Sequence, residues 1–236
     1  TKLRREDFGR VIACGLSGVA INQMLFIRGL TLTTGIHAAL LMLTTPLLIT
    51  VFAIWVLKEK LRPLQVPGLL LGIGGAAWLI SGGARSATAT NPLLGDALIL
   101  VNAIFYSIYF ILVKPLMARY KPIEVVRWVF TAGLVFMLPF GLGEALHTPF
   151  EKFTAGDYAT LAAVVVTGTF LAYCFNAYGI RHLGAATTGA YIYTQPVFAV
   201  LIATLILHEY LSWQKALAAL LIFAGVFLVT WKPQKK

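Results

Sequence analysis

Long hydrophobic stretches alternate with short clusters of charged residues along the whole chain. The hydrocarbon core of a bilayer is about 30 Å thick, so a helix needs around 20 mostly apolar residues to cross it. The apolar stretches here run continuously, whereas the strands of a membrane barrel alternate polar and apolar residues. We therefore predict an all-α, polytopic membrane helical bundle. Its eight predicted spans lie at about 11–27, 34–57, 64–82, 94–113, 123–142, 158–180, 184–207 and 213–231.

Composition and charge agree with a membrane protein and set its expected orientation. Only 12% of the 236 residues are charged and 59% are hydrophobic, whereas soluble proteins average about 25% charged residues. Threading the chain through eight spans puts both termini and fifteen of the 19 Lys and Arg residues on one side. Because cytoplasmic loops are enriched in positive residues, we predict that both termini are cytoplasmic and that the protein lies in the cell (inner) membrane. The net charge of +10 then reflects orientation, and we expect no nucleic-acid partner.

Residues 7–80 and 157–230 carry the same pattern, 150 positions apart and without a gap. If each unit holds five spans, an odd number, the second unit crosses the membrane in the opposite direction from the first. Inverted repeats of this kind are a signature of alternating-access transporters. The matching positions include Asp7 and Asp157, Gly18 and Gly168, Gly29 and Gly179, Thr44 and Thr194, Pro46 and Pro196, Glu59 and Glu209, and Gly75 and Gly225.

The two units differ in length within this chain. The second unit, 93–236, holds five predicted spans, and the first, 1–84, holds three. The segment 85–92 between them is predicted to be an extracytoplasmic linker because small and polar residues dominate it. A complete first unit would start about 57 residues before Thr1, which leaves room for two more helices. We therefore expect a ten-helix protein whose first two helices precede this sequence.

Two segments resemble the EamA module, which defines the drug/metabolite transporter (DMT) superfamily. They read LTTPLLITVFAIWVLKEKLRPLQVPGLLLGIGG at 43–75 and YTQPVFAVLIATLILHEYLSWQKALAALLIFAG at 193–225. In each, a Thr-x-Pro in mid-span is followed about a dozen residues later by Glu at the span end, and then by another apolar helix. The resemblance covers nearly the whole chain. It implies two inverted five-helix units around a central cavity, with the lipid bilayer and a small-molecule metabolite as partners.

Polar residues near the middle of the predicted spans are the candidates for substrate binding. A polar side chain that faces lipid is unfavourable, so such groups turn toward the bundle interior or a cavity. Several recur at helical spacing, which places them on one helix face. Alternatively, the Thr and Gln side chains bond to neighbouring helices and the prolines only bend theirs. The predicted substrate-binding residues are Gln23, Thr45, Asn102, Tyr106, Tyr173, Asn176, Tyr191 and Gln195, and the predicted hinges are Pro46 and Pro196.

Charged residues are absent from the middle of all eight predicted spans. A central charge costs at least about 2.5–3.5 kcal/mol and is usually kept for function. This argues against an organophosphate or nucleotide-sugar carrier and favours a neutral, zwitterionic or weakly amphipathic substrate. We interpret Glu59 and Glu209, at the ends of their spans, as solvated charges. His37 is the one residue within a span that could titrate near neutral pH.

These features predict an integral-membrane transporter, working as an exporter, that moves a small metabolite such as an amino acid by alternating access. A passive channel could use the same repeats, and a proton-coupled drug exporter could take its acidic residue from upstream helices. The sequence holds no nucleophile–base pair that would indicate an enzyme. We expect no cofactor and no metal, since Cys14 and Cys174 lack ligand partners at the usual spacing.

A run of glycines in the third predicted span indicates close helix packing. Gly68 and Gly72 form a small-xxx-small pattern, and Gly74 and Gly75 follow. Small residues let two membrane helices approach until their backbones touch. We expect this packing within the chain, and a homodimer remains an alternative to a monomer.

Overall fold

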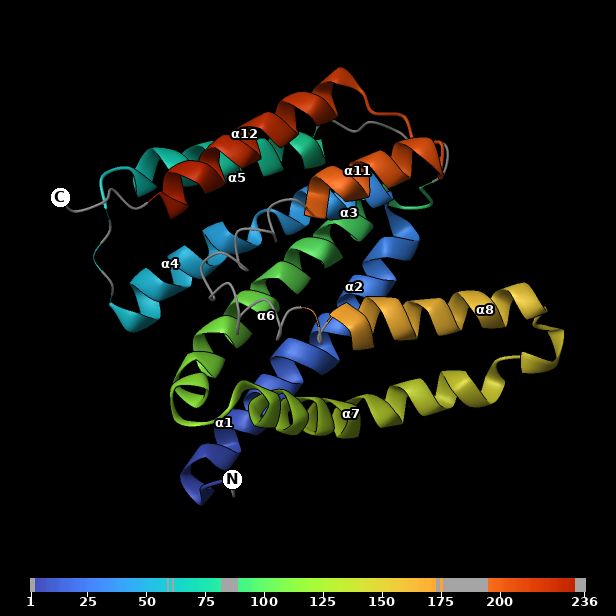
Figure 1. The fold of residues 1–236 in the computed structure, drawn as a ribbon. Coiled ribbons are helices and arrows are strands. Elements are labelled where there is room, and N and C mark those ends of the chain that lie inside the picture. Colours follow the sequence, from blue (N-terminus) through green and yellow to red (C-terminus); the bar gives the residue numbers. More distant parts are fainter. Residues whose placement is uncertain are drawn as a thin grey trace.

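The computed structural model describes residues 3–58, 60, 62–81, 89–172, 175 and 195–231. The regular structure in these residues is helical throughout, which confirms the predicted fold class (Figure 1). The elements are α1 (Arg5–Gly15), the π-helical η1 (Leu16–Ala20), α2 (Ile21–Leu32), α3 (Gly35–Met42), α4 (Thr45–Leu57), α5 (Gln65–Ser81), α6 (Pro92–Arg119), α7 (Pro122–His147), the 3-10 turn η2 (Phe150–Lys152), α8 (Ala155–Ala163), the π-helical η3 (Val164–Leu171), α11 (Gln195–Leu205) and α12 (Trp213–Thr230).

Most of the predicted spans correspond to helices of the structure. Within the part of the chain that the structure describes, five segments are long and apolar enough to cross a membrane: Arg5–Leu32, Gly35–Val56, Pro92–Arg119, Pro122–His147 and Trp213–Thr230. α5 is a shorter apolar helix of 17 residues. These six coincide with predicted spans. The other two predicted spans overlap α8 with η3, and α11, and most of the rest of each lies outside the described residues.

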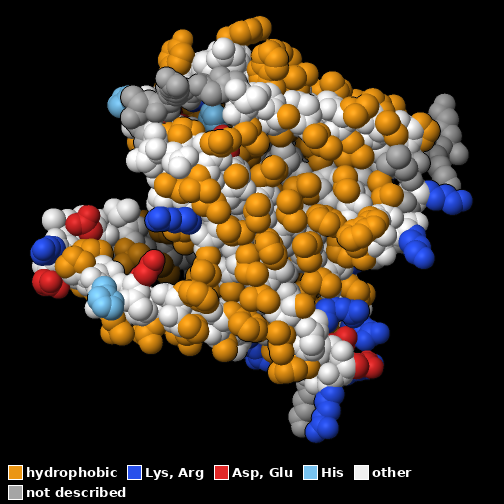
Figure 2. All heavy atoms as spheres, turned by 180° about the vertical axis from the view of Figure 1, so that it is seen from behind, with side chains coloured by type: hydrophobic (Ala, Val, Ile, Leu, Met, Phe, Trp, Pro, Cys, Tyr) orange, Lys and Arg blue, Asp and Glu red, His pale blue; other side chains and the backbone are white. Residues whose placement is uncertain are grey.

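The surface carries the apolar side chains that a lipid-facing bundle requires. Hydrophobic side chains cover most of the face shown in Figure 2, and most charged side chains lie toward its margins. Trp55 is 77% exposed and Leu70 is 69% exposed. Large apolar surfaces of this kind mark contact with a membrane or a partner. Together with the long apolar helices, they define a multi-pass membrane protein.

Two hydrophobic cores hold the described helices together. One joins α3, α4, α5, α11 and α12 around residues such as Ile36 and Ile222, and it includes Ile99 of α6. The other joins α1, α6 and α7 around Leu116 and Val125. Because α6 contributes Ile99 to the first core and Leu116 to the second, this long helix ties the two parts of the bundle together.

α5 and α12 lie side by side and pack through glycines (Figure 1). A Cβ at Gly68 would lie 2.8 Å from the Gly225 carbonyl oxygen, and a Cβ at Gly225 would lie 2.5 Å from the Gly68 carbonyl oxygen. The missing side chains therefore allow the two backbones to touch. This confirms the close approach predicted for Gly68, Gly72 and Gly75. Gly74 is an exception, because it is exposed and a Cβ there would meet open space.

The contacts between α5 and α12 are reciprocal. Gly68 meets Gly225, and Gly75 meets Ala218. In the repeat, Gly68 corresponds to Ala218 and Gly75 corresponds to Gly225, so each contact is the image of the other. Reciprocity of this kind is what a two-fold axis produces at an interface. It also requires α5 and α12 to run antiparallel, so the two repeats cross the membrane in opposite directions, as the sequence predicted.

Burial follows the same repeat position by position. The buried residues of α5 are Gln65, Gly68, Gly72, Gly75, Ala76 and Leu79, and those of α12 are Lys215, Ala218, Ile222, Gly225, Val226 and Val229. Every residue of the second set lies 150 positions after a residue of the first. The two helices therefore present the same face to the interior, and only the chemistry of the side chains differs.

The backbone repeats in its irregular features as well. Lys58 and His208, which correspond in the repeat, both adopt a left-handed conformation with φ of 53°. The π-helical segment η1 has its counterpart within η3. Ser17 in η1 donates its hydroxyl to the carbonyl four residues earlier at 2.7 Å, and Thr167 in η3 does the same at 2.7 Å. Irregularities that recur at equivalent positions belong to the architecture of the repeat.

An ionic network joins α1 to the connection between α6 and α7. Asp7 is 1% exposed and accepts hydrogen bonds from the Tyr120 hydroxyl at 2.8 Å and the Arg119 guanidinium at 3.2 Å. Arg10 lies 3.7 Å from the same carboxylate. We call this the Asp7 end of the bundle. The opposite end, where α3, α6 and α12 begin, is called the His37 end.

Candidate functional site

The second predicted span is two helices with a turn in the middle. Leu43 and Thr44 form this turn between α3 and α4. The Thr44 N–H bonds to the Leu41 carbonyl at 2.9 Å, and the Thr44 hydroxyl donates to the same oxygen at 2.7 Å. Pro46 lies in the first turn of α4, where its missing N–H breaks no helical bond. Helices interrupted at mid-depth commonly form the binding sites of transporters.

Thr45 lies beside the turn and faces α6. The Ser107 hydroxyl lies 3.3 Å from the Thr45 carbonyl oxygen and 2.7 Å from the Ala103 carbonyl oxygen, either of which it can reach as a donor. The Thr45 side chain is buried, and its Oγ1 has no hydrogen-bond partner within the described residues. A predicted site residue is thus held against α6 by its backbone while its hydroxyl stays available.

Asn102 links α6 to α2. Its Nδ2 donates to the Asn22 carbonyl oxygen at 2.6 Å, and its side chain is 1% exposed. Its Oδ1 is buried without a partner in the described part of the chain. A buried polar atom left unpaired costs about 1–3 kcal/mol. Each of the two such atoms, on Asn102 and on Thr45, is therefore a position where a bound molecule or water would be favourable.

Tyr106 stands one helical turn beyond Asn102 and is half-buried among other rings. Its centroid lies 5.9 Å from that of Tyr109 and 5.0 Å from that of Phe110. Tyr109 in turn packs against Gly18 of η1. π-Helical segments are found frequently at functional sites. The stretch of α6 from Asn102 to Phe110 therefore contacts α2 through Asn102, the broken span through Ser107 and η1 through Tyr109.

Of the remaining predicted site residues, only Gln23 has a described side chain. Gln23 is exposed on α2. Gln195 and Pro196 begin α11, and their side chains lie outside the description. Tyr173, Asn176 and Tyr191 also lie outside the described residues. The candidate site consists of the three predicted residues whose described side chains are buried or half-buried: Thr45, Asn102 and Tyr106.

Charged side chains are buried at the His37 end, which the sequence did not predict. His37, Asp96 and Lys215 are between 1% and 3% exposed. Asp96 and Lys215 are each the third residue of a predicted span, so a charge just inside a span boundary was the available signal. No group of metal ligands forms among the described residues.

Glu209 is bonded to the protein, and interpreting it as a solvated charge was wrong. Its carboxylate accepts hydrogen bonds from the backbone N–H groups of Gly35 at 2.7 Å and Ile36 at 3.0 Å. These N–H groups begin α3 and have no intrahelical partner, so a carboxylate there satisfies them and complements the helix dipole. Glu59, its counterpart in the repeat, lies outside the described residues.

Gly95 allows α6 to start directly against the end of α2. A Cβ at this position would lie 2.7 Å from the backbone nitrogen of Thr33. The adjacent Asn91 N–H bonds to the Leu32 carbonyl at 3.1 Å, which fixes the contact.

We expect Gly95→Ala to lower the free energy of unfolding by about 1–3 kcal/mol, because a methyl group cannot fit without moving the backbone. Thermal unfolding in detergent measures this effect. Gly143→Ala is the control, since Gly143 is exposed and a Cβ there meets open space. An unchanged melting temperature for Gly95→Ala would contradict the close contact.

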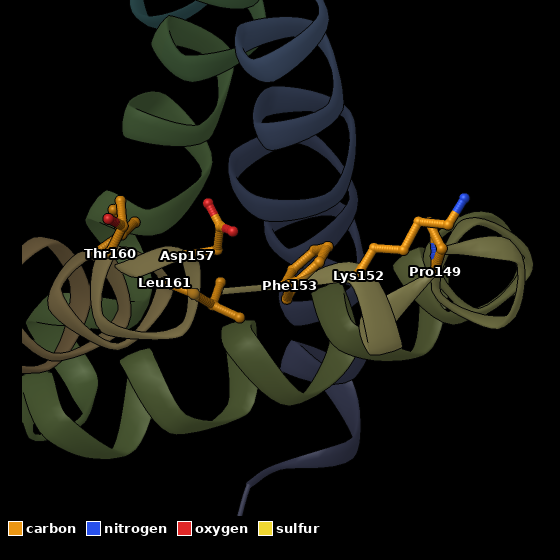
Figure 3. A pocket seen from close by; sticks show the side chains of 7 residues that line it. Pro149, Lys152, Phe153, Asp157, Thr160 and Leu161 are labelled. Carbon is orange, nitrogen blue, oxygen red and sulfur yellow. The ribbon is translucent and has the colours of Figure 1, made fainter. Parts of the chain in front are cut away.

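An open hollow lies at the turn between α7 and α8, and it is not the candidate site. Its volume is about 600 Å³ and its lining includes Lys152, Phe153 and Asp157. In Figure 3 the Lys152 amine extends away from the Asp157 carboxylate. Asp157 instead forms a capping box with Thr154. Its carboxylate accepts a hydrogen bond from the Thr154 N–H at 2.8 Å. This turn projects from the bundle (Figure 1), far from the broken span.

The inverted repeat, the interrupted span and the apolar surface define a helical membrane transporter. The chain matches the EamA-like transporter family over residues 1–81 and 93–231, and it belongs to that family. The family and its curated relatives are transporters, not enzymes.

Similar proteins cover nearly the whole chain. An uncharacterized transporter of Archaeoglobus fulgidus is 24% identical over 92% of this chain and 74% of its own length. An uncharacterized transporter of Bacillus subtilis is 25% identical over 99% of this chain and 71% of its own. A protein named a probable terminal-alkyne amino-acid exporter, from Streptantibioticus cattleyicolor, is 27% identical over 96% of this chain and 74% of its own. A solved crystal structure, 22% identical, has the same fold with a TM-score of 0.61 over 97% of this chain and 77% of that chain.

Proposed function

We propose that this protein exports a small neutral or zwitterionic metabolite, such as an amino acid, by alternating access between its two repeats. One observation carries the proposal: two uncharged polar atoms, Asn102 Oδ1 and Thr45 Oγ1, are buried without partners in the described residues where α6 meets α2 and the broken span. The reciprocal contact of α5 with α12 supplies the two-fold arrangement that alternating access requires.

The substrate class follows from the chemistry of these groups. The described side chains around the site offer amide, hydroxyl and aromatic surfaces, and the described acids and bases that are buried lie toward the two ends of the bundle. A site built from neutral dipoles suits a substrate whose net charge is zero. The relative named an amino-acid exporter, at 27% identity, agrees with this class.

Orientation completes the proposal. The positive-inside rule places the Asp7 end, with both chain termini, on the cytoplasmic side of the cell membrane. The His37 end then faces the extracytoplasmic side. We take 1–84 and 93–236 as the two repeat units and 85–92 as the linker between them, within a monomer or a homodimer.

Counterflow in proteoliposomes tests this function. With unlabelled L-leucine inside, a carrier accelerates uptake of labelled L-leucine, and the rate saturates. A panel of neutral amino acids extends the test to other side chains. A rate that never saturates and shows no counterflow would indicate a passive channel, and no stimulation by any member of the panel would remove the amino-acid class.

We expect Asn102→Ala and Tyr106→Ala each to raise the half-saturating concentration about tenfold or to abolish counterflow. Loss of one hydrogen bond or ring contact to the substrate is worth about 1–1.5 kcal/mol, which corresponds to a change of about 5- to 12-fold. Tyr158→Ala is the matched control, because Tyr158 is an exposed tyrosine near the α7–α8 turn. Kinetics like the unsubstituted protein in both site variants would exclude these residues from the site.

A further inference from the structure

Five polar side chains meet at the His37 end, and transport of a neutral substrate does not require them. We call Thr33, His37, Asp96, Glu209 and Lys215 the His37 cluster. They come from the α2–α3 connection, α3, α6, the α11–α12 connection and α12, so the cluster joins both repeats. Thr33, His37, Asp96 and Lys215 are at most 7% exposed.

Asp96 is the centre of the cluster. Its Oδ2 lies 2.8 Å from His37 Nδ1, and the Thr33 hydroxyl donates to its Oδ1. Both oxygens of the carboxylate are therefore engaged. The contact with Asp96 makes Nδ1 the nitrogen of His37 that carries the proton in the neutral ring, because a carboxylate accepts and does not donate.

The described acids of the cluster outnumber its bases when His37 is neutral. Asp96 and Lys215 are buried and carry opposite charges, and the half-buried Glu209 adds a second carboxylate near Lys215. Among the described residues nearby, Arg28 of α2 and His208 of the α11–α12 connection are exposed, and α5 and α11, which also pack on α3, have no titratable side chain in their described ranges. A proton added to His37 therefore lies next to the Asp96 carboxylate, in a cluster with two carboxylates and one ammonium.

The second nitrogen of His37 is the place for that proton. Nε2 is buried and has no hydrogen-bond partner within the described residues. In the neutral ring it is an unpaired acceptor. Once protonated it becomes a donor, which carries an additional penalty unless water or another acceptor reaches it. Proton uptake therefore favours an arrangement in which this end of the bundle opens to water.

The repeat indicates that the fold itself does not need titratable groups at two positions of the cluster. The counterpart of Lys215 is Gln65, which is also buried but neutral. The counterpart of His37 is Thr187, whose side chain does not titrate. At these two positions the cluster adds titratable groups, whereas Glu209 corresponds to Glu59, which is also acidic.

We propose that the His37–Asp96 pair is a proton-binding site, loaded from the extracytoplasmic side, whose occupancy shifts the equilibrium between closed and open states of the His37 end. The proton comes from bulk water, binds Nε2 and returns to water by the same route. Its consequence for transport rests on the proposed alternating access, but the binding of the proton does not.

Nitrogen-15 NMR of histidine-labelled protein in detergent tests the site without any substrate. We expect the His37 ring, assigned by its loss in His37→Gln, to change from the neutral to the imidazolium pattern when the pH is lowered from 8 to 5. In Asp96→Asn the ring loses the carboxylate that lies 2.8 Å from its Nδ1, so this change should be lost. Size-exclusion profiles establish that each variant is folded.

His147 provides the internal reference. It is exposed at the end of α7, with Nδ1 2.7 Å from the Gly143 carbonyl oxygen, and its ring signals should be the same in every variant at each pH. A His37 ring that stays neutral at pH 5 in the unsubstituted protein would overturn the proposal. A His37 titration unaffected by Asp96→Asn would overturn it as well.

Counterflow of L-leucine at matched internal and external pH tests the consequence for transport. We expect the rate to differ about fivefold or more between pH 5.5 and pH 7.5, and to lose this dependence in His37→Gln. His147→Gln should keep the pH dependence. If His37→Gln retained the full dependence, the link between the proton and opening would be overturned. Absence of counterflow at any pH, with the His37 titration intact, would overturn the proposed function and leave the proton site standing.

Discussion

Replacing Gly225 by Val is expected to prevent stable association of α5 with α12. A Cβ at this position would lie 2.5 Å from the Gly68 carbonyl oxygen and 2.5 Å from the Gly72 nitrogen. Both are backbone atoms, so no side-chain rotation can relieve the overlap. Overpacking typically costs 1–3 kcal/mol and occasionally more, and we expect at least about 3 kcal/mol here. The fraction of protein that elutes as a single folded species in detergent, and its melting temperature, measure the effect.

Gly74→Val is the matched control for this prediction. Gly74 lies on the same pair of packed helices, but it is exposed and a Cβ there meets nothing within 4 Å. The same substitution should therefore leave the yield and the melting temperature nearly unchanged. If both variants lost stability equally, a loss of glycine in a membrane helix would be the cause and the reciprocal contact would not.

Replacing Glu209 by Ala is expected to have the second-largest effect. The carboxylate accepts from the Gly35 and Ile36 N–H groups at the start of α3 and lies near Lys215. Without it, two backbone donors lose their charged acceptor and the buried ammonium loses a counter-ion. Unpaired buried groups cost about 1–3 kcal/mol each, and more when charged. We expect a loss of roughly 2–4 kcal/mol in the free energy of unfolding, measured by chemical or thermal unfolding in detergent.

Two further variants show whether the effect comes from the charge of the Glu209 carboxylate at this position or from the loss of a glutamate in general. Glu209→Gln keeps the size and one acceptor oxygen but removes the charge, so it should lie between Ala and Glu. Glu144→Ala removes an exposed glutamate of α7 and should change stability by less than about 0.5 kcal/mol. Equal melting temperatures for Glu209→Ala and Glu144→Ala would mean that the cap of α3 does not contribute to stability.

Patterns along the linear sequence predicted much of the architecture. Continuous apolar runs predicted the spans because a bilayer sets one length for every crossing helix. The match of Gly75 with Gly225 predicted an inverted repeat, and the reciprocal packing of α5 and α12 confirmed it. The site was predicted less completely. Asn102 and Tyr106 lie on α6 and the Thr45 backbone contacts that helix at Ser107, whereas four of the other predicted side chains, among them that of Tyr191, are not described.

The irregular features could not be read from residue types. Pro46 signalled an interruption, but not a turn that ends one helix at Met42 and starts another at Thr45. Nothing local distinguishes the π-helical residues around Gly18, whose absent side chain makes room for Tyr109. Glu209 was misinterpreted because its sequence neighbours are charged or aromatic, whereas its partners, Gly35 and Ile36, are more than 170 residues away.

The sequence alone determined that this protein is a multi-span helical transporter built from two opposed units, because hydrophobic length and a repeated pattern can both be read along the linear chain without knowing which residues touch. Only the tertiary structure decided which polar groups share an environment. Asp96 reaches His37 across 59 positions of the chain, and Asn102 reaches Asn22 across 80. Contacts of this range depend on helix crossings and on close approaches such as that at Gly95, and these arise only when the whole bundle packs.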